Sequence, residues 1–296
     1  MKLRSRTKLT RREMFNLFFL LPLLSINITF FLFPFLKSLY MSLFNWKLLG
    51  NKEFIGLANY IKAFTDKKFL HSLIFTFKYA IIVTPALFIV AFIMAILVNK
   101  NIRGVGIFRT IYFLPVVISM TASADIWLWI YNEIYGVLNH VLLLLGIIEQ
   151  PIAWMHKPEV SLPAVCFMVT WKMAGFSMLM LLGAFQSIDD EIYQAADIDG
   201  ANAIQRFFRI TFPLIRPTLG LSLIISVIGS VLAFEQFVIM TKGGPSSQTM
   251  TAVHYIYTTS FKHFKFGYGA AMSMILLVIL AILSYFQAAV TRDATE

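Results

Sequence analysis

Long stretches without charge are the feature that most constrains this chain. Six runs of about 20 residues are rich in Leu, Ile, Val and Phe, and each contains at most one charged residue. A helix of that length crosses about 30 Å of hydrocarbon and satisfies its own backbone hydrogen bonds. Strands that span a membrane are about half as long and alternate in polarity, which these runs do not. The sequence therefore predicts an all-α integral membrane protein with about six transmembrane helices, at 14–36, 79–99, 110–131, 162–182, 219–240 and 268–290.

The amino-acid composition also indicates a membrane protein and argues against nucleic-acid binding as the explanation for the net charge. Of the 296 residues, 58% are hydrophobic and 14% are charged, whereas a soluble domain carries roughly 25% charged residues. The net charge of +10 is compatible with nucleic-acid binding. However, six of the 25 Lys and Arg lie in 1–12, as is typical of the cytoplasmic flank of a membrane helix. The only cysteine, Cys166, supports neither a disulfide framework nor a thiolate metal site.

The first apolar run is expected to be retained as a membrane helix. It is longer than the apolar segment of a signal peptide, and the residues at 34–36 lack the small side chains of a cleavage site. With the N-terminus inside, the cytoplasmic segments hold 13 Lys and Arg and the outside segments hold 9. We therefore expect both termini in the cytoplasm. The expected parts are a basic N-terminus at 1–13, a transmembrane domain at 14–290 with a cytoplasmic loop at 183–217, and a cytoplasmic tail at 291–296.

Helix signals mark the first half of that cytoplasmic loop. Ser187 is expected to cap a helix, and the three acidic residues at 189–191 favour the positive end of its dipole. The helix is expected to run to about Ala196. Gly200 then ends it, where the backbone needs a positive φ or a close approach. In the outside loop at 132–161, the apolar stretch 141–148 is expected to form a short helix at the membrane interface.

A second short helix is predicted in the other half of the loop. Asp199 is expected to cap it, and its apolar side chains lie at 204–210. Pro213 and Pro217 are expected to end it before the next membrane helix. The residues alone leave two interpretations open, a linker packed on the ends of the bundle and a docking element for a cytoplasmic partner.

One run in this loop carries a family resemblance. Tyr193-Gln-Ala-Ala-Asp-Ile-Asp-Gly-Ala201, followed by Ile210-Thr-Phe-Pro213, resembles the EAA loop of binding-protein-dependent ABC importer permeases. That loop stands before the penultimate span, as here. Gln194 occupies the position of the family's glutamate, which puts in doubt any partner contact that needs a negative charge there. The resemblance implies an ATPase-coupling loop formed by Tyr193, Gln194, Ala195, Ala196, Asp199, Gly200, Ala201 and Pro213.

Other segments extend the resemblance over most of the chain. Phe54–Tyr60 is similar to the family's loop after the first span, and Arg103–Pro115 is similar to the start of its third span. Thr241–Pro245, with the aromatic residues at 255–261, is similar to the region before its last span. Together they resemble the maltose-type carbohydrate uptake family 1, in the permease encoded first of two. This implies the type I importer fold and a permease subunit that carries a sugar or oligosaccharide across the bacterial plasma membrane.

The resemblance also implies a complex. Its members are a second homologous permease, two ATP-binding cassette subunits inside, and a solute-binding protein outside that delivers the sugar. ATP and Mg²⁺ are expected in the ATPase subunits, because this sequence has no Gly-x-x-x-x-Gly-Lys-Ser/Thr phosphate loop. We therefore expect no catalytic residue, no metal and no bound cofactor in this chain, which is not expected to be an enzyme.

Polar residues inside the predicted spans suggest a substrate pathway. A charge near the middle of the bilayer costs about 2.5–3.5 kcal/mol, so it usually faces a cavity or a partner. Glu235 stands beside an aromatic residue and an amide, and carboxylates, amides and rings suit the hydroxyls and C–H faces of sugars. The resemblance implies sugar contacts in the same part of that span. The candidate pathway residues are Glu235, Gln236, Phe234, Trp171, Asp125 and Trp127.

Each of these residues also has a structural interpretation. Asp125 and Lys172 can pair within the fold or lie near the interface, and Trp residues near span ends often form an aromatic belt. A secondary transporter driven by an ion gradient is the alternative function. It predicts more buried carboxylates and matched broken helices in two halves, and the apolar runs show neither. A membrane enzyme predicts a cluster of reactive groups, and the five histidines have no ligand spacing.

Overall fold

The computed structural model describes residues 11–100 and 102–292. The expected basic N-terminus, 1–13, and the tail, 291–296, lie largely outside these ranges. The chain divides into two compact units. Unit 1 contains the residues up to Ala63 together with Thr259–Met274, and unit 2 contains Phe64–Thr258 together with the residues from Ile275 onward.

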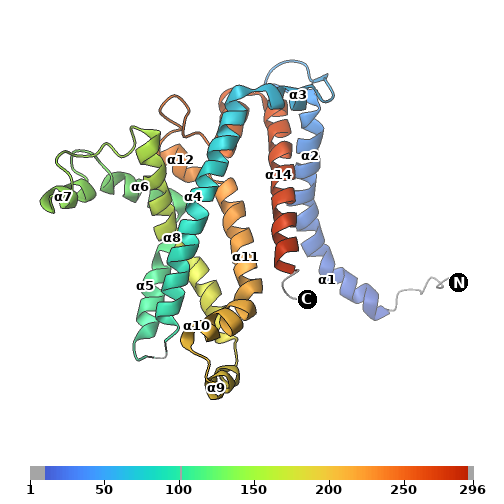
Figure 1. Cartoon of the computed structure of the whole chain (residues 1–296). Helices are drawn as coiled ribbons and strands as arrows, with labels where there is room; N and C mark the ends of the chain where they lie inside the picture. The colour runs from blue at the N-terminus through green and yellow to red at the C-terminus, as the bar shows by residue number, and fades with distance from the viewer. Residues whose placement is uncertain (1–10, 101, 293–296) are drawn as a thin grey trace. The chain divides into compact units, whose positions relative to one another are not determined.

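Unit 1 begins with a continuous helical segment formed by α1 (Arg11–Asn27), a π-helical turn η1 (Ile28–Leu32) and α2 (Phe33–Ser42). It contains the first predicted span and extends it at both ends (Figure 1). A short antiparallel hairpin follows, with β1 (Phe44–Asn45) paired to β2 (Glu53–Phe54).

Polar contacts hold the rest of unit 1 against that hairpin. Asn59 in α3 (Ala58–Thr65) donates to the backbone oxygens of Ser42 at 2.9 Å and Phe44 at 3.0 Å. The backbone N–H of Gly267, near the start of α14 (Phe266–Arg292), donates to the Trp46 oxygen at 3.1 Å. A Cβ at Gly267 would overlap the Phe44 backbone oxygen, so this close approach requires glycine.

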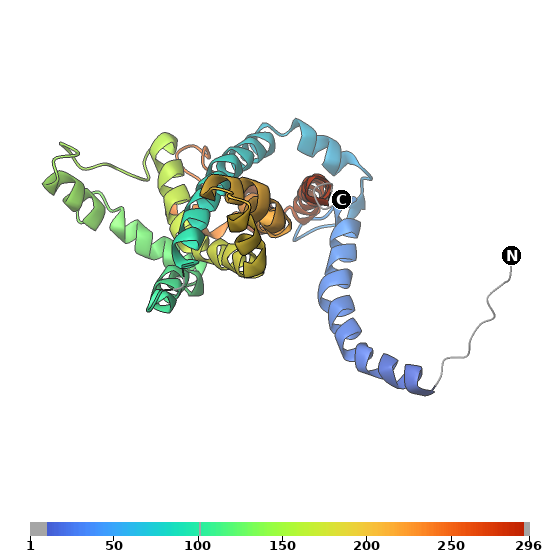
Figure 2. The same ribbon diagram turned by 60° about the horizontal axis from the view of Figure 1, so that its bottom comes forward.

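Unit 2 is a helix bundle built on α4 (Lys67–Val98) and α8 (Pro158–Gln186). The helices α5 (Val105–Val117) and α11 (Phe212–Val231) pack against this pair (Figures 1 and 2). The buried contact contains small side chains, Ala91 and Ala95 from α4 and Ala174 from α8. In α8, a Cβ at Gly175 would overlap the backbone oxygen of Tyr112 in α5. Small residues at helix interfaces allow such close backbone approach in membrane proteins.

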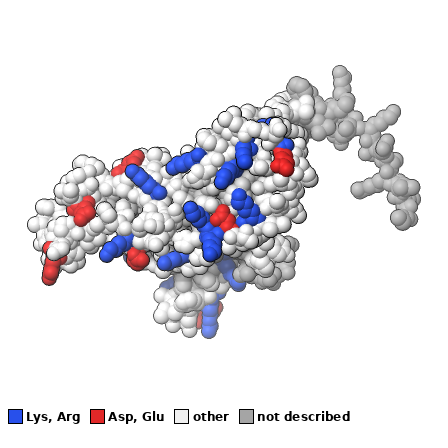
Figure 3. All heavy atoms as spheres, turned by 90° about the horizontal axis from the view of Figure 1, so that it is seen from above, with Lys and Arg blue, Asp and Glu red and all other residues white. Residues whose placement is uncertain are grey.

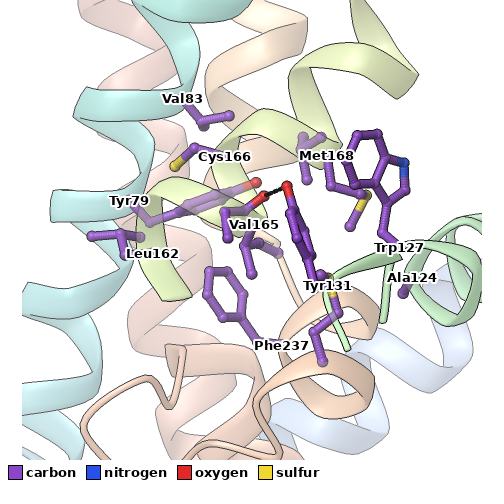
Figure 4. Close-up of a cluster of buried hydrophobic side chains, with 14 of the residues drawn as sticks. Tyr79, Val83, Ala124, Trp127, Tyr131, Leu162, Val165, Cys166, Met168 and Phe237 are labelled. Atoms are coloured by element: carbon purple, nitrogen blue, oxygen red, sulfur yellow. Dashed lines mark hydrogen bonds between the residues drawn. The ribbon is translucent and has the colours of Figure 1, made fainter. Parts of the chain in front are cut away.

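A second buried cluster joins α4, α8 and the later helices (Figure 4). Tyr79 and Phe237 are among its most deeply buried side chains, and their rings meet edge to face at 4.9 Å. The Tyr131 hydroxyl donates to the Ala164 backbone oxygen at 3.0 Å. This bond fixes the end of α6 (Met120–Ile130) against α8. The loop at 132–161 forms α7 (Val137–Leu144), so a short helix is present there, although it begins before 141 and ends before 148.

Two expected helices are interrupted. The single helix predicted at 110–131 is wrong, because α5 and α6 are bent by 98°. Ile118 takes an extended conformation there, and the Ser119 side chain caps α6 by accepting from the Ala122 N–H at 3.1 Å. The helix predicted at 219–240 is also divided. The helix α11 ends at Val231, and α12 (Glu235–Met240) begins after a short break.

The remaining helix lengths differ at their ends. The helix α4 begins at Lys67 rather than at 79, because Asp66 caps it by accepting from the backbone N–H groups of Lys68 and Phe69. By length and composition, five helices in the described ranges can cross a membrane, or six if the bent pair α5–α6 counts as one. This number agrees with the predicted count.

Candidate functional site

The two interrupted helices meet inside unit 2. The Thr121 hydroxyl, in the first turn of α6, donates to Oε2 of Glu235 at 3.1 Å, in the first turn of α12. The next residue, Gln236, is buried and its amide nitrogen donates to the Tyr79 hydroxyl of α4 at 3.3 Å. Polar atoms from three helices therefore converge where two helices stop.

A cavity of about 140 Å³ lies at this meeting point, and we call it the break cavity. Its lining includes Met120 at the start of α6 and Met173 of α8. Hydroxyl and amide groups, which both donate and accept hydrogen bonds, form its polar lining. These polar lining residues are Tyr79, Ser177, Ser226, Ser230 and Gln236.

A buried lysine supports the break between α5 and α6. Lys172 of α8 is 5% exposed, and its ammonium donates to the backbone oxygens of Val116 at 3.3 Å and Ile118 at 2.5 Å. These carbonyls belong to the end of α5, where a positive charge is favourable. The ammonium also interacts electrostatically with Glu235, at a longer range than a direct ion pair.

The structure brings only some of the predicted pathway residues together. Gln236 lines the break cavity, Glu235 is exposed beside it, and Phe234 is half-buried with its ring 5.1 Å from that of Tyr257. Trp127 is 8% exposed and packs in the core against the rings of three neighbours, Tyr131, Phe167 and Trp171.

Two predicted residues lie elsewhere on unit 2. Asp125 is exposed on α6, and Trp171 lines a separate apolar groove of about 500 Å³ between α4 and α8. The cavity residues that sequence reasoning missed are hydroxyl-bearing side chains inside apolar runs, such as Tyr79 and Ser230. An isolated hydroxyl in an apolar run is too common to single out, so no signal in one sequence could have found them.

The cytoplasmic loop predicted from the sequence contains two short helices. The helix α9 (Asp190–Ile198) is followed by α10 (Ala203–Arg206), a π-helical turn η2 (Phe207–Thr211) and α11 without a break. Gly200 has a φ of +73°, and a Cβ there would meet no atom within 4 Å, so of the two predicted reasons for this glycine the described chain shows the positive φ and no close approach. The side chains of Asp197 and Arg206 form an ion pair across this turn.

Three local expectations about this loop are wrong. Ser187 caps the end of α8 rather than the start of α9, and its hydroxyl donates to the Ala184 oxygen at 2.8 Å. Asp199 ends α9, whereas Asn202 caps α10 through a reciprocal bond with Gln205. The predicted stop at Pro213 and Pro217 does not occur. Pro213 lies directly after the junction of η2 and α11, within a continuous helical segment, and Pro217 lies inside α11.

The coupling-loop residues differ in their exposure. Ala196 is buried, Tyr193 and Ala201 are half-buried, and Gln194 and Ala195 are exposed. Large apolar side chains are also exposed on α9, α10 and η2, with Ile198 at 87%, Ile204 at 70% and Phe208 at 65%. Exposed apolar groups that gather on one surface are typical of a protein interface.

A hollow of about 610 Å³ lies beside α9, at the end of unit 2 where α4 and α8 finish. Its lining includes Asn99, Asp189 and Tyr193. Arg109 of α5 also lines it and donates to the Val98 oxygen at 2.9 and 3.2 Å, which ties α5 to the end of α4. Among the described residues, no group of three or more His, Cys, Asp or Glu is arranged to hold a metal ion.

Membrane-length helices, two interrupted helices around a polar cavity, and a helical pair at one end define a multi-pass membrane transport protein. The chain belongs to the family described as binding-protein-dependent transport system inner membrane component, whose model matches residues 55–296. It is a permease subunit of the inner membrane, and the resemblance drawn from the sequence is confirmed.

Known relatives agree with this assignment. The chain is 33% identical over 279 residues to the lactose transport system permease protein LacF of Rhizobium radiobacter, with 93% of each protein covered. It is 30% identical over 268 residues to the trehalose/maltose transport system permease protein MalF of Thermococcus litoralis, which covers 90% of this chain and 89% of that protein.

The fold matches that of a solved importer. A chain from a bacterial ABC transporter involved in alginate import has a TM-score of 0.83, with 22% identity and coverage of 97% of this chain and 98% of that chain. The predicted all-α importer permease fold is thereby confirmed. Two helices are broken, contrary to the expectation from the apolar runs, so helix continuity does not exclude an ion-driven transporter. Family membership excludes that alternative instead.

Proposed function

We propose that this chain is the membrane-spanning subunit of an ATP-driven importer that moves a sugar or oligosaccharide across the bacterial plasma membrane. The observation that carries the proposal is the convergence of Thr121, Glu235, Gln236 and Tyr79 where two helices of a permease fold are interrupted. The names of the lactose and trehalose/maltose relatives favour a carbohydrate substrate.

The chemistry of the break cavity suits such a substrate. Sugars present many hydroxyls, which need partners that both donate and accept, and Ser, Tyr and Gln side chains do both. Discontinuous helices that bind substrate near the middle of the bilayer are common in transporters. The cavity of about 140 Å³ is smaller than a usual ligand pocket of roughly 300–1,000 Å³. This chain therefore supplies one part of the pathway, and a second homologous permease supplies the rest.

The two ends of unit 2 suit two different protein partners, an ATPase subunit at one end and the solute-binding protein at the other. The pair α9–α10, with its exposed apolar side chains, is the docking element for one of two ATP-binding cassette subunits, which bind ATP and Mg²⁺. In this orientation α9 and both termini lie in the cytoplasm. The opposite end displays charged side chains of both signs (Figure 3). A hollow there of about 340 Å³ is lined by Lys67, Lys68 and His71. This end faces the extracytoplasmic solute-binding protein.

Uptake by cells that lack this subunit tests the proposal. Deletion should abolish uptake of one member of a panel of labelled mono-, di- and oligosaccharides, and the plasmid-borne chain should restore it. The tagged chain should also co-purify with an ATPase and a second permease. Unchanged uptake of every carbohydrate on the panel would contradict the substrate class.

Substitution of the pathway residues gives a finer test. Glu235→Ala and Gln236→Ala should each reduce sugar uptake while the complex still assembles, because they remove polar groups at the break cavity. Glu149→Ala, at an exposed glutamate of the outside loop, is the matched control. Normal uptake kinetics in both pathway variants would remove these residues from the pathway, and loss of assembly would assign them a structural role.

A further inference from the structure

We infer that Lys172 is a positioning residue of the transport pathway, which holds the α5–α6 break in the geometry that places Thr121 beside Glu235. The inference rests on the proposed function, since it concerns the same pathway. It gives a role to a buried charge, within 11–100 and 102–292, that the pathway residues themselves do not explain.

Lys172 lies too far from both ends of its helix for its side chain to reach the membrane surface, as lysines in membrane helices ordinarily do. Lys172 stands at the midpoint of α8 (Pro158–Gln186), so each end of the helix is about 21 Å away along its axis. A lysine near a helix end extends its side chain to the interface, but this side chain is far too short to do so. Lys172 is 5% exposed, so its ammonium must be stabilised inside the bundle.

The ammonium finds its partners at the end of α5. A helix leaves its last backbone carbonyls without partners inside the helix, and such groups are costly within a membrane unless another group satisfies them. The ammonium of Lys172 satisfies the oxygens of Val116 and Ile118 at 3.3 and 2.5 Å. It therefore stabilises the point at which α5 ends and the chain turns by 98° into α6.

The same turn sets the geometry of the pathway. Met120 enters the break cavity directly after the turn, and Thr121 donates to Glu235 at 3.1 Å. The positive charge of Lys172 also interacts with the carboxylate of Glu235. Loss of the ammonium would leave the two backbone carbonyls without their donor. The break would then relax, and Met120 and Thr121 would move together.

The test follows the accessibility of a cysteine at the break. Cys166 is the only native cysteine, so Met120→Cys in a Cys166→Ala background provides a single reporter. Its rate of reaction with a membrane-impermeant maleimide is measured in the assembled complex. Lys172→Met, which keeps the length of the side chain without its charge, should change this rate at least five-fold. Lys172→Arg, which keeps a cationic donor, should leave it within two-fold.

Uptake is measured in parallel without the reporter substitutions. Lys172→Met should lower the maximal rate of sugar uptake at least ten-fold, and Lys172→Arg should retain more than half of it. Lys157→Met, the same substitution at an exposed lysine before α8, should leave uptake unchanged. Reporter labelling and uptake at the parent level in Lys172→Met would overturn the inference, even while Glu235→Ala reduces uptake and the proposed function stands.

A second variant keeps the inference testable if Lys172→Met is not recovered in the membrane. Glu235→Gln removes the charge partner but leaves the contacts of Lys172 with the two carbonyls. Labelling of the Met120→Cys reporter should then stay within two-fold of the parent. A five-fold change would show that Glu235, rather than Lys172, sets the geometry of the break, and would overturn the inference.

Discussion

The hydroxyl of Tyr193 lies 2.9 Å from the hydroxyl of Thr211, and this hydrogen bond joins α9 to the helical segment that continues into α11. Thr211 is buried, and the chain is helical without interruption from Ala203 to Val231. A displacement of α9 would therefore act on a helix whose far end lines the break cavity. We propose that this contact is part of the coupling between ATP hydrolysis and transport.

Removal of either hydroxyl should weaken coupling. A hydrogen bond of this kind contributes about 1 kcal/mol, which corresponds to a factor of about five. Tyr193→Phe and Thr211→Val should each lower sugar-stimulated ATP hydrolysis of the purified complex by about that factor, while the complex remains assembled. Tyr285→Phe, at an exposed tyrosine of α14, is the matched control. Stimulation at the wild-type level in both variants would exclude this contact from coupling.

Two substitutions at Gly200 distinguish the effect of its backbone conformation on uptake from the effect of a close contact with the ATPase. Its φ of +73° disfavours a β-branched side chain by about 1–3 kcal/mol, whereas Asn tolerates that conformation. Within the described chain a Cβ at Gly200 would meet no atom within 4 Å. Gly200→Val should insert normally and abolish uptake, and Gly200→Asn should retain uptake unless the ATPase backbone lies close. Wild-type uptake by Gly200→Val, with the ATPase still bound, would refute docking at this loop.

The surface of α9 gives an independent test of docking. Ala195 is exposed, so a substitution there leaves the packing of this chain unchanged. Ala195→Asp should reduce the amount of ATPase that co-purifies, because the contact would bury an unpaired charge. Ile147→Asp, at an exposed residue of the loop at 132–161, is the control and should not affect ATPase binding. Equal ATPase recovery in both variants would contradict a docking role for this face of α9.

Two glycines of α8 allow the close packing of α8 against α5 to be tested by the same substitution at a packed and at an open position. A Cβ at Gly175 would overlap the Tyr112 backbone oxygen of α5, whereas a Cβ at Gly183 would meet nothing within 4 Å. Gly175→Ala should destabilise the purified protein by about 1–3 kcal/mol, and Gly183→Ala should be neutral or stabilise it by up to about 1 kcal/mol. Thermal unfolding in detergent measures both variants. Equal melting temperatures would show that α5 and α8 do not approach so closely.

The orientation is tested by reporter fusions. Fusions after Gly136 and Pro245 should report an extracytoplasmic location, and fusions after Arg103 and Ile204 a cytoplasmic one. The hollow beside α9 is lined by Asn99, Val105 and Tyr193, so the structure supports one common side for the last two sites. A cytoplasmic signal after Pro245 would contradict the six-span topology.

Sequence reasoning succeeded where the signal is local or repeated. The helices of the membrane bundle follow from runs of apolar residues, and the left-handed Gly200 follows from a single glycine between two helical segments. The cap of α10 was misassigned because several residues near Gly200 have suitable side chains. Asn202 is the residue that caps α10, because its side chain and that of Gln205, three residues later, each accept a hydrogen bond from the other's backbone N–H.

The broken helices could not be predicted for a different reason. Both breaks lie inside apolar runs, and their stability depends on groups distant in the sequence. The α5–α6 break is supported by Lys172, and Glu235 receives its hydrogen bond from Thr121, a residue 114 positions earlier. Hydropathy measures the cost of placing a segment in lipid, but it does not show which distant side chain satisfies a carbonyl in that segment.

Sugar uptake by proteoliposomes that contain the purified complex and its solute-binding protein tests directly whether this permease belongs to an ATP-driven importer. Accumulation should require ATP on the side of the membrane that carries α9, and it should be unchanged when proton and sodium gradients are collapsed. Glu235→Ala should reduce it in the assembled complex. Accumulation that proceeds without ATP and follows an imposed ion gradient would contradict the account.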